Sequence, residues 1–256
     1  MGLKYQQNYR VPFYESDAFK KMRISSILAV ALQISGEQST LLGRSDVWVS
    51  ERFNLFWAVI EYEVEITRLP EFNEQIIIET EATSYNKFFC YRNFYFKDEA
   101  GNQLVEIHST WVLMSKNSRK IERVLDEIVA PYDSEKISKI LRPHKFNKLE
   151  HFEQCEQAVY PVRFSALDMN GHVNNAKYYD WAADMVDFDF RKSHQPAKLF
   201  IKYNHEVLYG EKIQALMSWE GLVSHHNFND GSTQIEIHWS EVTDKDSVST
   251  DSPVSK

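Results

Sequence analysis

The sequence predicts an α+β fold made of two similar units, in each of which antiparallel strands wrap around a long helix. The first observation behind this prediction is a repeat, because four residues near the N-terminus recur at a constant distance of 151 residues (160 − 9). The other two observations are an amphipathic helix pattern after each copy and a series of strand-like runs after each helix. The recurring pairs are Tyr9 and Tyr160, Val11 and Val162, Phe13 and Phe164, and Asp17 and Asp168.

The first unit, residues 1–133, begins with a strand pattern at residues 9–13, where apolar and polar residues alternate. Apolar residues at a spacing of three or four then predict a helix over residues 24–42, for which Gly43 is a natural stop. Further strand-like runs follow, with a turn at residues 99–102 between the last two. These runs are Gln75–Ala82, Phe88–Phe96 and Leu104–Met114.

The second unit, residues 159–242, repeats this order with a strand pattern at residues 160–164 and a helix pattern from Val173 to Val186. Residues 201–203 then match residues 60–62 as the next strand. Residues 134–158 are expected to form a short helix and a connector, and the polar tail 243–256 is expected to be disordered. The last strand-like runs are Lys212–Val223 and Thr233–Val242, with a turn at Asn229-Asp230-Gly231 between them.

Composition excludes several classes of protein. The 256-residue chain has a formal net charge of −8, which disfavours a nucleic-acid binder because phosphate backbones need a basic face. No stretch approaches the roughly 20 apolar residues of a membrane span, and the N-terminus has no signal core, so the expected location is the cytoplasm. Neither Cys90 nor Cys155 belongs to a CxxC pair, and the adjacent His225 and His226 are expected to be a surface pair in a loop. We therefore predict no metal ion and no organic cofactor.

The run Asp168-Met169-Asn170-Gly171-His172-Val173-Asn174-Asn175 places a carboxylate, an amide and an imidazole at a strand-to-helix junction. Turn chemistry by itself makes Asn170 or Asn174 a helix cap and leaves His172 incidental. The corresponding residues of the first unit, however, are Phe19 and Lys21, so the turn does not require an amide and an imidazole. A helix N-terminus also favours the negative charge that develops when a carbonyl is attacked. The sequence therefore predicts one working site, in the second unit.

The pattern Asp168-x-Asn170-x-His172-Val173-Asn174-Asn175-x-x-Tyr178, with Trp181 three residues later, resembles the active-site signature of the acyl-acyl carrier protein thioesterases. The resemblance spans nearly the whole chain and implies a tandem (double) hotdog fold and a thioester hydrolase. It also implies that the first unit binds the acyl chain and that the second carries out the chemistry. A second segment of the family matches Tyr203-Asn204-His205-Glu206-Val207, with valine where many plant members have cysteine.

This resemblance implies that Asp168, Asn170, His172 and Glu206 are the catalytic residues. Glu206 is expected to act as general base on water, while His172 orients the water or protonates the departing thiolate. Asn170 would polarise the thioester carbonyl, and Asp168 would either hold the turn in place or itself attack the thioester. Glu65 is the expected counterpart of Glu206 in the first unit. A cysteine nucleophile is disfavoured because both cysteines lie outside the matched motifs.

Three other functions stay open. An enoyl hydratase or dehydratase motif resembles Asp-x-Asn-Pro-x-His, with histidine five residues after aspartate, whereas the step from Asp168 to His172 is four and Gly171 replaces the proline. An acyl-CoA thioesterase has a similar motif, which the sequence does not distinguish. The third alternative is a non-catalytic acyl-binding protein, and the presence of all four site residues argues against it.

The expected partner is an acyl carrier protein that bears a fatty acyl chain. Carrier proteins are acidic, so association with this acidic chain requires a basic patch. A homodimer paired through sheet edges is one option for the oligomeric state. The acyl channel is expected along the helix of residues 24–42 and the strands around Phe53, Phe56, Trp57 and Ile60. The candidate basic patches are Lys20-Lys21-Arg23, Arg119-Lys120-Arg123 and Arg142-His144-Lys145-Lys148.

Overall fold

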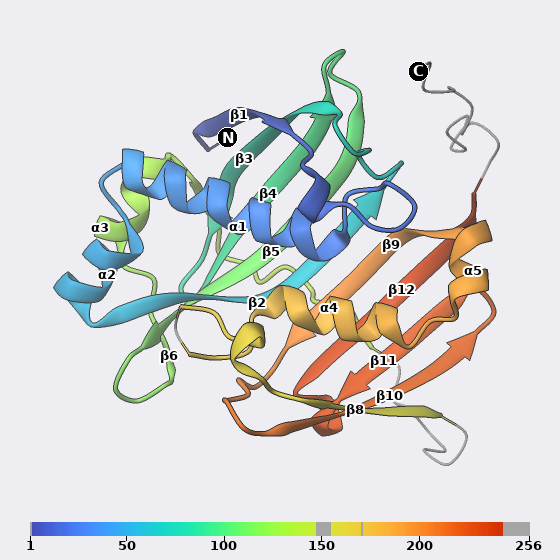
Figure 1. Cartoon of the computed structure of the whole chain (residues 1–256). Helices are drawn as coiled ribbons and strands as arrows, with labels where there is room; N and C mark the ends of the chain where they lie inside the picture. The colour runs from blue at the N-terminus through green and yellow to red at the C-terminus, as the bar shows by residue number, and fades with distance from the viewer. Residues whose placement is uncertain (1, 147–154, 170, 243–256) are drawn as a thin grey trace.

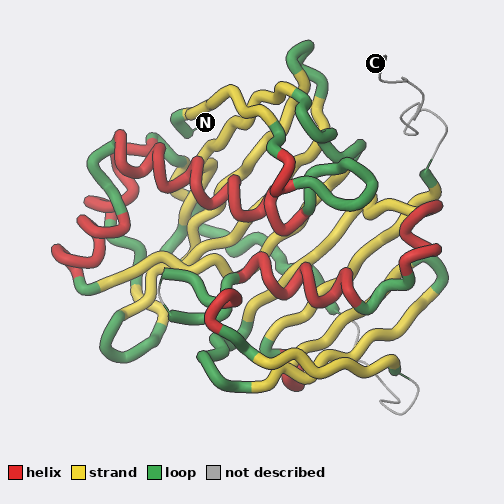
Figure 2. Tube along the Cα trace, in the orientation of Figure 1, coloured by secondary structure: helices red, strands yellow, loops and turns green. Residues whose placement is uncertain are grey.

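The computed structural model describes residues 2–146, 155–169 and 171–242. Within these residues, twelve strands form one sheet that is antiparallel except for one short parallel pair. The two long helices lie across the same face of this sheet, one over each half (Figure 1). Figure 2 shows the resulting two layers, with helices on one side and strands on the other. Each half thus has the predicted arrangement of strands around a helix.

The N-terminal half has the strand order β1-β3-β4-β5-β2, with β6 paired to β5 and β7 paired to β3. Helix α1 ends beside Gly43, whose φ of +67° is in the left-handed region that glycine adopts without strain. The elements are β1 (Lys4–Arg10), the 3-10 turn η1 (Phe13–Glu15), α1 (Ile24–Leu41), α2 (Asp46–Phe53), β2 (Leu55–Ile66), β3 (Gln75–Tyr85), β4 (Phe89–Asp98), β5 (Gln103–Ser115), β6 (Ile121–Glu122), α3 (Asp126–Val129), η2 (Ala130–Tyr132) and β7 (Glu135–Lys136).

The C-terminal half has the strand order β9-β12-β11-β10-β8. Its long helix is shorter than its counterpart in the first half and is followed by an additional helix. The elements are β8 (Glu156–Pro161), η4 (Phe164–Ala166), α4 (Asn175–Asp184), α5 (Phe188–Ser193), β9 (His194–Tyr203), β10 (Lys212–Glu220), β11 (Val223–Phe228), η5 (Asn229–Gly231) and β12 (Thr233–Glu241).

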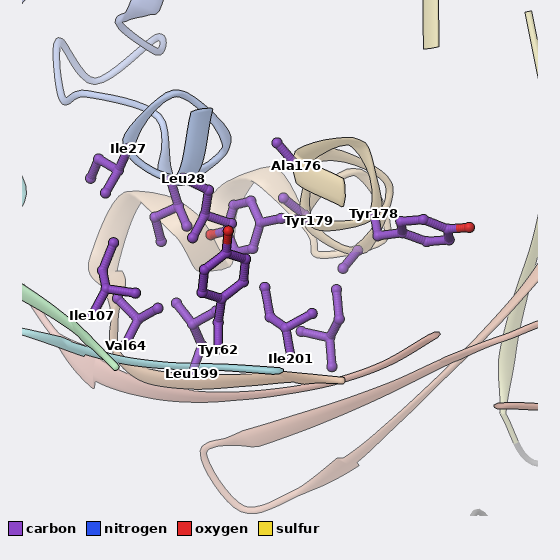
Figure 3. Packing of buried hydrophobic residues seen from close by; sticks show 14 of the residues in the cluster. Ile27, Leu28, Tyr62, Val64, Ile107, Ala176, Tyr178, Tyr179, Leu199 and Ile201 are labelled. Carbon is purple, nitrogen blue, oxygen red and sulfur yellow. The ribbon is translucent and has the colours of Figure 1, made fainter. Parts of the chain in front are cut away.

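Strands β2 and β9 join the two halves into one sheet. In this pairing Glu61 lies opposite Lys202, and these are the central residues of the two matching triplets found in the sequence. The two repeats are therefore related by an approximate two-fold axis that passes through this pair. Next to it, Tyr62 and Ile201 project from the central strands toward α1 and α4 (Figure 3). The apolar faces of both helices are thus buried against the strands where the repeats meet.

The predicted strand patterns at residues 9–13 and 160–164 extend too far. The strands end at Arg10 and Pro161, and Phe13 and Phe164 begin 3-10 turns with 81% and 83% of their surface exposed. In each copy the next backbone N–H, of Val11 or Val162, still bonds to the residue just before β3 or β10, and the chain turns away from the sheet after it. The repeat itself is confirmed, since both turns begin at equivalent residues.

Three other local predictions are wrong. Phe53 lies in α2 rather than in a strand, because Ser45 caps a short helix there. The run Lys212–Val223 is split by Gly221, whose φ of +58° reverses the chain between β10 and β11. His225 and His226 consequently lie in β11, where both are buried, and not in a surface loop. Of the predicted connector, residues 134–158, the described part 134–146 contains no helix, and strand β8 already begins at Glu156. The tail 243–256, which is predicted to be disordered, lies outside the described residues.

Glu236 of β12 contacts His144, a residue of the segment that follows β7. Its carboxylate lies 3.2 Å from Nε2 of His144, 3.3 Å from Nδ1 of His225 and 2.8 Å from Nε2 of His238. The His144 ring also stacks on Phe200, with 3.6 Å between ring centres. Burial raises the pKa of Glu236, but hydrogen bonds from His238 and His144 outweigh burial, so the pKa lies below its ordinary value. Among the described residues no group of His, Cys, Asp or Glu side chains is arranged to hold a metal ion.

Replacing Glu236 with glutamine is expected to lower the free energy of unfolding at neutral pH by about 1–3 kcal/mol, because the amide removes the negative charge and replaces one of the two acceptor oxygens that the imidazoles face with a donor. A folded-state pKa below the ordinary value of 4.5 means that the stabilisation is complete above pH 4.5 and is lost as the pH falls through the folded pKa. Urea unfolding across this range should therefore show the variant and the wild type converging in acid. Glu220→Gln is the control, since its carboxylate is exposed and lies 3.8 Å from His225. A loss of stability that is constant from pH 7 into acid would contradict this account.

Candidate active site

The turn before α4 brings the predicted aspartate and histidine together. The backbone N–H of Asp168 donates to the carbonyl oxygen of His172 at 2.8 Å, and the Asp168 carboxylate accepts from the N–H of His172 at 3.2 Å. Gly171 has a φ of +80°, which favours glycine at this position. Asn174 caps α4 by accepting from the N–H of Ala176 at 2.9 Å. Asn174 is thus the cap that turn chemistry predicts, while Asn170 lies outside the described residues.

The segment after β9 runs beside this turn and brings Glu206 to it. The N–H of Val173 donates to the carbonyl oxygen of Val207 at 3.0 Å, and His172 pairs with Leu208 in an isolated β-bridge. As a result, Nε2 of His172 lies 3.5 Å from Oε2 of Glu206. The structure therefore brings together Asp168, His172 and Glu206, three of the four residues predicted as catalytic.

The first repeat has the same turn with different side chains. Asp17 there makes the equivalent hydrogen bonds to Lys21, at 2.8 Å and 2.9 Å. The N–H of the next residue, Met22, donates to Pro70, as Val173 donates to Val207, so the repeats are offset by 137 residues here (207 − 70). The counterpart of Glu206 is therefore Leu69, a buried core residue.

The prediction that Glu65 is the counterpart of Glu206 is wrong. Glu65 lies within β2 and its carboxylate pairs with Lys198 of β9 at 2.9 Å. The prediction failed because the offset of the matching triplets, 141 residues (202 − 61), does not hold beyond them: β2 continues for four residues after its triplet, to Ile66, whereas β9 ends with its triplet at Tyr203. The first repeat thus has Lys21 at the position of the His172 imidazole and Leu69 at the position of the Glu206 carboxylate.

Arg119 belongs to this site, although sequence analysis placed it only in a candidate docking patch. It lies in the turn between β5 and β6, and its Nη2 atom contacts Oε2 of Glu206 and lies 3.3 Å from Nε2 of His172. Its guanidinium group also lies over the ring of Phe56, 4.5 Å from the ring centre. No motif marks Arg119, because its contacts join residues 53 and 87 positions apart.

A cavity of about 1450 Å³ extends from this site into the N-terminal half. Phe56, Trp57 and Ile60 line it, as predicted, together with Gly36 and neighbouring residues of α1. Phe53 instead packs against Trp48 in α2. The volume exceeds that of typical small-molecule pockets and suits a long ligand.

The part of the cavity within the N-terminal half is lined by a buried arginine and a half-buried cysteine. Arg92 donates to Oε1 of Gln38 at 2.6 Å and to the hydroxyl of Thr80 at 2.9 Å. Burial lowers the pKa of Arg92 to about 10, so its guanidinium stays charged at neutral pH. Burial raises the pKa of Cys90 to about 12, although Arg92 opposes this. Cys90 is therefore a thiol at neutral pH, which agrees with the prediction that it is not a nucleophile.

Solved structures share this architecture. One is a Lactobacillus plantarum protein provisionally described as an oleoyl thioesterase, which is 30% identical, with a TM-score of 0.89 over 95% of this chain and 98% of its own. The 12:0-ACP thioesterase from Umbellularia californica is 19% identical, with a TM-score of 0.82 over 94% of this chain and 99% of its own. At that identity the second match shows the fold alone. The fold is thus the tandem hotdog fold that the sequence predicts.

Family models match both halves of the chain: the acyl-ACP thioesterase N-terminal domain matches residues 2–132 and the C-terminal domain matches residues 149–251. The chain therefore belongs to the acyl-ACP thioesterase family. Among curated relatives, the chloroplastic oleoyl-acyl carrier protein thioesterase of Coriandrum sativum is 25% identical over 236 residues, and the chloroplastic palmitoyl-acyl carrier protein thioesterase of Arabidopsis thaliana is 24% identical over 239 residues. The matches cover 86% of this chain but only 63% and 56% of the relatives.

Proposed function

We propose that this protein hydrolyses the thioester of a fatty acyl-acyl carrier protein, releases the free fatty acid and so ends elongation of the chain. The main support is the single cavity that joins the His172–Glu206 pair to α1 and β2 of the N-terminal half. This arrangement offers a site for the thioester at one end and room for an acyl chain along the rest. Family membership supports the same reaction class.

In the proposed reaction, Glu206 takes a proton from water as the water oxygen bonds to the thioester carbonyl carbon. N–H groups at the start of α4 and the Asn170 amide would stabilise the charge on the carbonyl oxygen. When the carbon–sulfur bond breaks, the proton passes from Glu206 through Nε2 of His172 to the departing thiolate. The 3.5 Å separation of Glu206 and His172 suits this transfer, after which both groups are back in their starting states.

Asp168 has two candidate roles, to hold the turn or to attack the thioester. Its hydrogen bonds across the turn to His172 favour the first role. A single turnover in ¹⁸O-labelled water distinguishes them by mass spectrometry. Direct attack of water puts the label into the fatty acid in the first turnover. Attack by Asp168 expels the thiolate and forms a mixed anhydride, and water that opens this anhydride at the Asp168 carbonyl carbon leaves the label in the Asp168 carboxylate.

The substrate class is tested with matched acyl-carrier-protein, acyl-CoA and trans-2-enoyl thioesters, with free fatty acid followed by mass spectrometry. Release from the carrier protein in strong preference to CoA supports the proposal. Equal or preferred release from CoA would make the protein an acyl-CoA thioesterase, and addition of water to the enoyl substrate would make it a hydratase. No reaction with any of the three would favour a non-catalytic acyl-binding protein.

Of the three basic patches, Arg119-Lys120-Arg123 is the best candidate for carrier docking, because Arg119 contacts Glu206 of the candidate site. Lys120 and Arg123 are exposed and follow Arg119, which contacts Glu206. The Lys20-Lys21-Arg23 patch lies on the turn of the first repeat, where Phe19 stacks on Phe188 of α5. In Figure 1, α5 and β6 are at opposite ends of the molecule. An acidic carrier protein would therefore meet Lys120 and Arg123 when its acyl group enters the site.

Charge reversal of Lys120 and Arg123 to glutamate is expected to raise the apparent KM for acyl-carrier protein about tenfold or more, because like charges oppose association. The KM for a small acyl thioester should not change, since that substrate needs no protein contact. Steady-state kinetics with both substrates at low ionic strength measures the difference. Lys20→Glu is the control and should affect neither substrate. Equal changes of KM for both substrates would argue against docking at this turn.

A further inference from the structure

Among the described residues of the β5–β6 turn, Arg119 is the one whose side chain contacts both Glu206 and His172. Its side chain is 39% exposed, equal to that of Glu206, so the contact lies at the mouth of the cavity and not in the core. The ring of Phe56 supports the guanidinium from the other side, which limits the orientations that Arg119 can adopt. A side chain from the N-terminal repeat thus completes a site whose other members belong to the C-terminal repeat.

The contact with His172 assigns the donor and the acceptor. A guanidinium group has only N–H donors, so a hydrogen bond at the 3.3 Å contact requires Nε2 of His172 to be the acceptor. The same Nη2 atom of Arg119 contacts Oε2 of Glu206. Arg119 therefore contacts both a carboxylate oxygen of Glu206 and Nε2 of His172, and these two atoms lie 3.5 Å apart.

We propose that Arg119 is a positioning residue for the thioesterase reaction: it holds Glu206 and Nε2 of His172 3.5 Å apart, and its N–H leaves Nε2 when that nitrogen accepts the proton from Glu206. This inference rests on the proposed function, in which Glu206 accepts a proton and passes it to Nε2 of His172. It makes catalysis in the C-terminal repeat dependent on a turn of the N-terminal repeat. Arg119 itself does not react and forms no covalent bond.

The test uses the whole protein and a small substrate, octanoyl-N-acetylcysteamine, so that carrier docking has no influence. Arg119→Gln is expected to lower kcat about tenfold to hundredfold, the scale of a misplaced catalytic group, with little change in KM. Arg119→Lys keeps the charge and should retain more activity than Arg119→Gln. Guanidinium ion at a non-denaturing concentration should restore part of the activity of Arg119→Ala but should not stimulate the wild type. Lys116→Gln is the matched control, because Lys116 lies in the same turn but hydrogen bonds to Ser50 of α2.

A double-mutant cycle with Glu206→Gln separates this inference from the proposed function. If Arg119 acts through Glu206, then Arg119→Gln should cause no further loss of kcat in the Glu206→Gln background. If Arg119→Gln has wild-type kcat while Glu206→Gln is strongly impaired, the role of Arg119 is overturned and the proposed function is not. Wild-type kcat in Glu206→Gln would overturn both. A lower melting temperature without a change in kcat or rescue by guanidinium would show that Arg119 only stabilises the turn, and would also overturn the inference.

Discussion

Replacing His172 with alanine is expected to lower kcat for acyl-carrier-protein hydrolysis by about two orders of magnitude or more, the usual scale for an acid-base group. The variant loses the nitrogen that lies 3.5 Å from Oε2 of Glu206 and through which we propose that the proton reaches the thiolate. Asn170→Ala should have an effect of similar size if its amide stabilises the oxyanion. Steady-state kinetics measures both, with circular dichroism and the melting temperature as checks of folding.

The repeat supplies a matched control for this experiment. Lys21 occupies the position of His172 in the first repeat, with the same backbone hydrogen bonds to the preceding aspartate. Its side chain pairs with Glu71, which lies outside the candidate site, at 2.7 Å. Lys21→Ala should therefore leave kcat unchanged. Near-wild-type kcat in both His172→Ala and Asn170→Ala would remove the basis for placing the chemistry at this turn.

Replacing Gly36 with leucine is expected to shift the preference toward shorter acyl chains. Gly36 lies in the interior of α1 and lines the cavity, and an added Cβ atom would meet no other atom within 4 Å. A leucine side chain would thus occupy the channel without strain. We expect kcat/KM for a hexadecanoyl substrate to fall about tenfold or more, because filling part of a preformed pocket excludes a long ligand. The octanoyl substrate should be affected much less.

Gly36→Ala distinguishes blocking of the channel from a change in the helix. Either substitution should raise the free energy of unfolding by about 0.5–1 kcal/mol, because glycine is unfavourable inside a helix. Only leucine adds enough volume to exclude a long chain. Thermal unfolding and kinetics with the two chain lengths separate the effects. Equal losses for octanoyl and hexadecanoyl substrates in Gly36→Leu would show that the acyl chain does not pass Gly36.

Much of the candidate site was predictable because its parts are local. The turn from Asp168 to His172 and the cap at Asn174 depend on residues close together in the chain, and their spacing indicates the geometry. A constant offset was enough to match Asn170 and His172 with Phe19 and Lys21, because Asp17–Lys21 and Asp168–His172 form equivalent turns. Glu206 was identified through a family resemblance, and its distance from His172 could not be read from the sequence.

The wrong predictions share a physical cause. Alternation of apolar and polar residues continues past Arg10 and Pro161, but a strand ends where its backbone loses a partner in the sheet. Glu65 seemed equivalent to Glu206 because the matching triplets do not show that β2, paired with β5 as far as Ile66, continues four residues longer than β9. In both cases the outcome depends on a segment far away in the chain.

The sequence by itself determined that this protein is a duplicated α+β fold with one chemically equipped turn, because helix periodicity, turn residues and repeats are properties of neighbouring residues. Only the tertiary structure decided that β2 and β9 merge the two halves into one sheet, that one cavity reaches from His172 to Arg92, and that Arg119 meets Glu206. These features depend on the register of β5, β2 and β9 across the sheet. That register is set by packing of the two helices against the strands from both repeats, and no stretch of the chain encodes it alone.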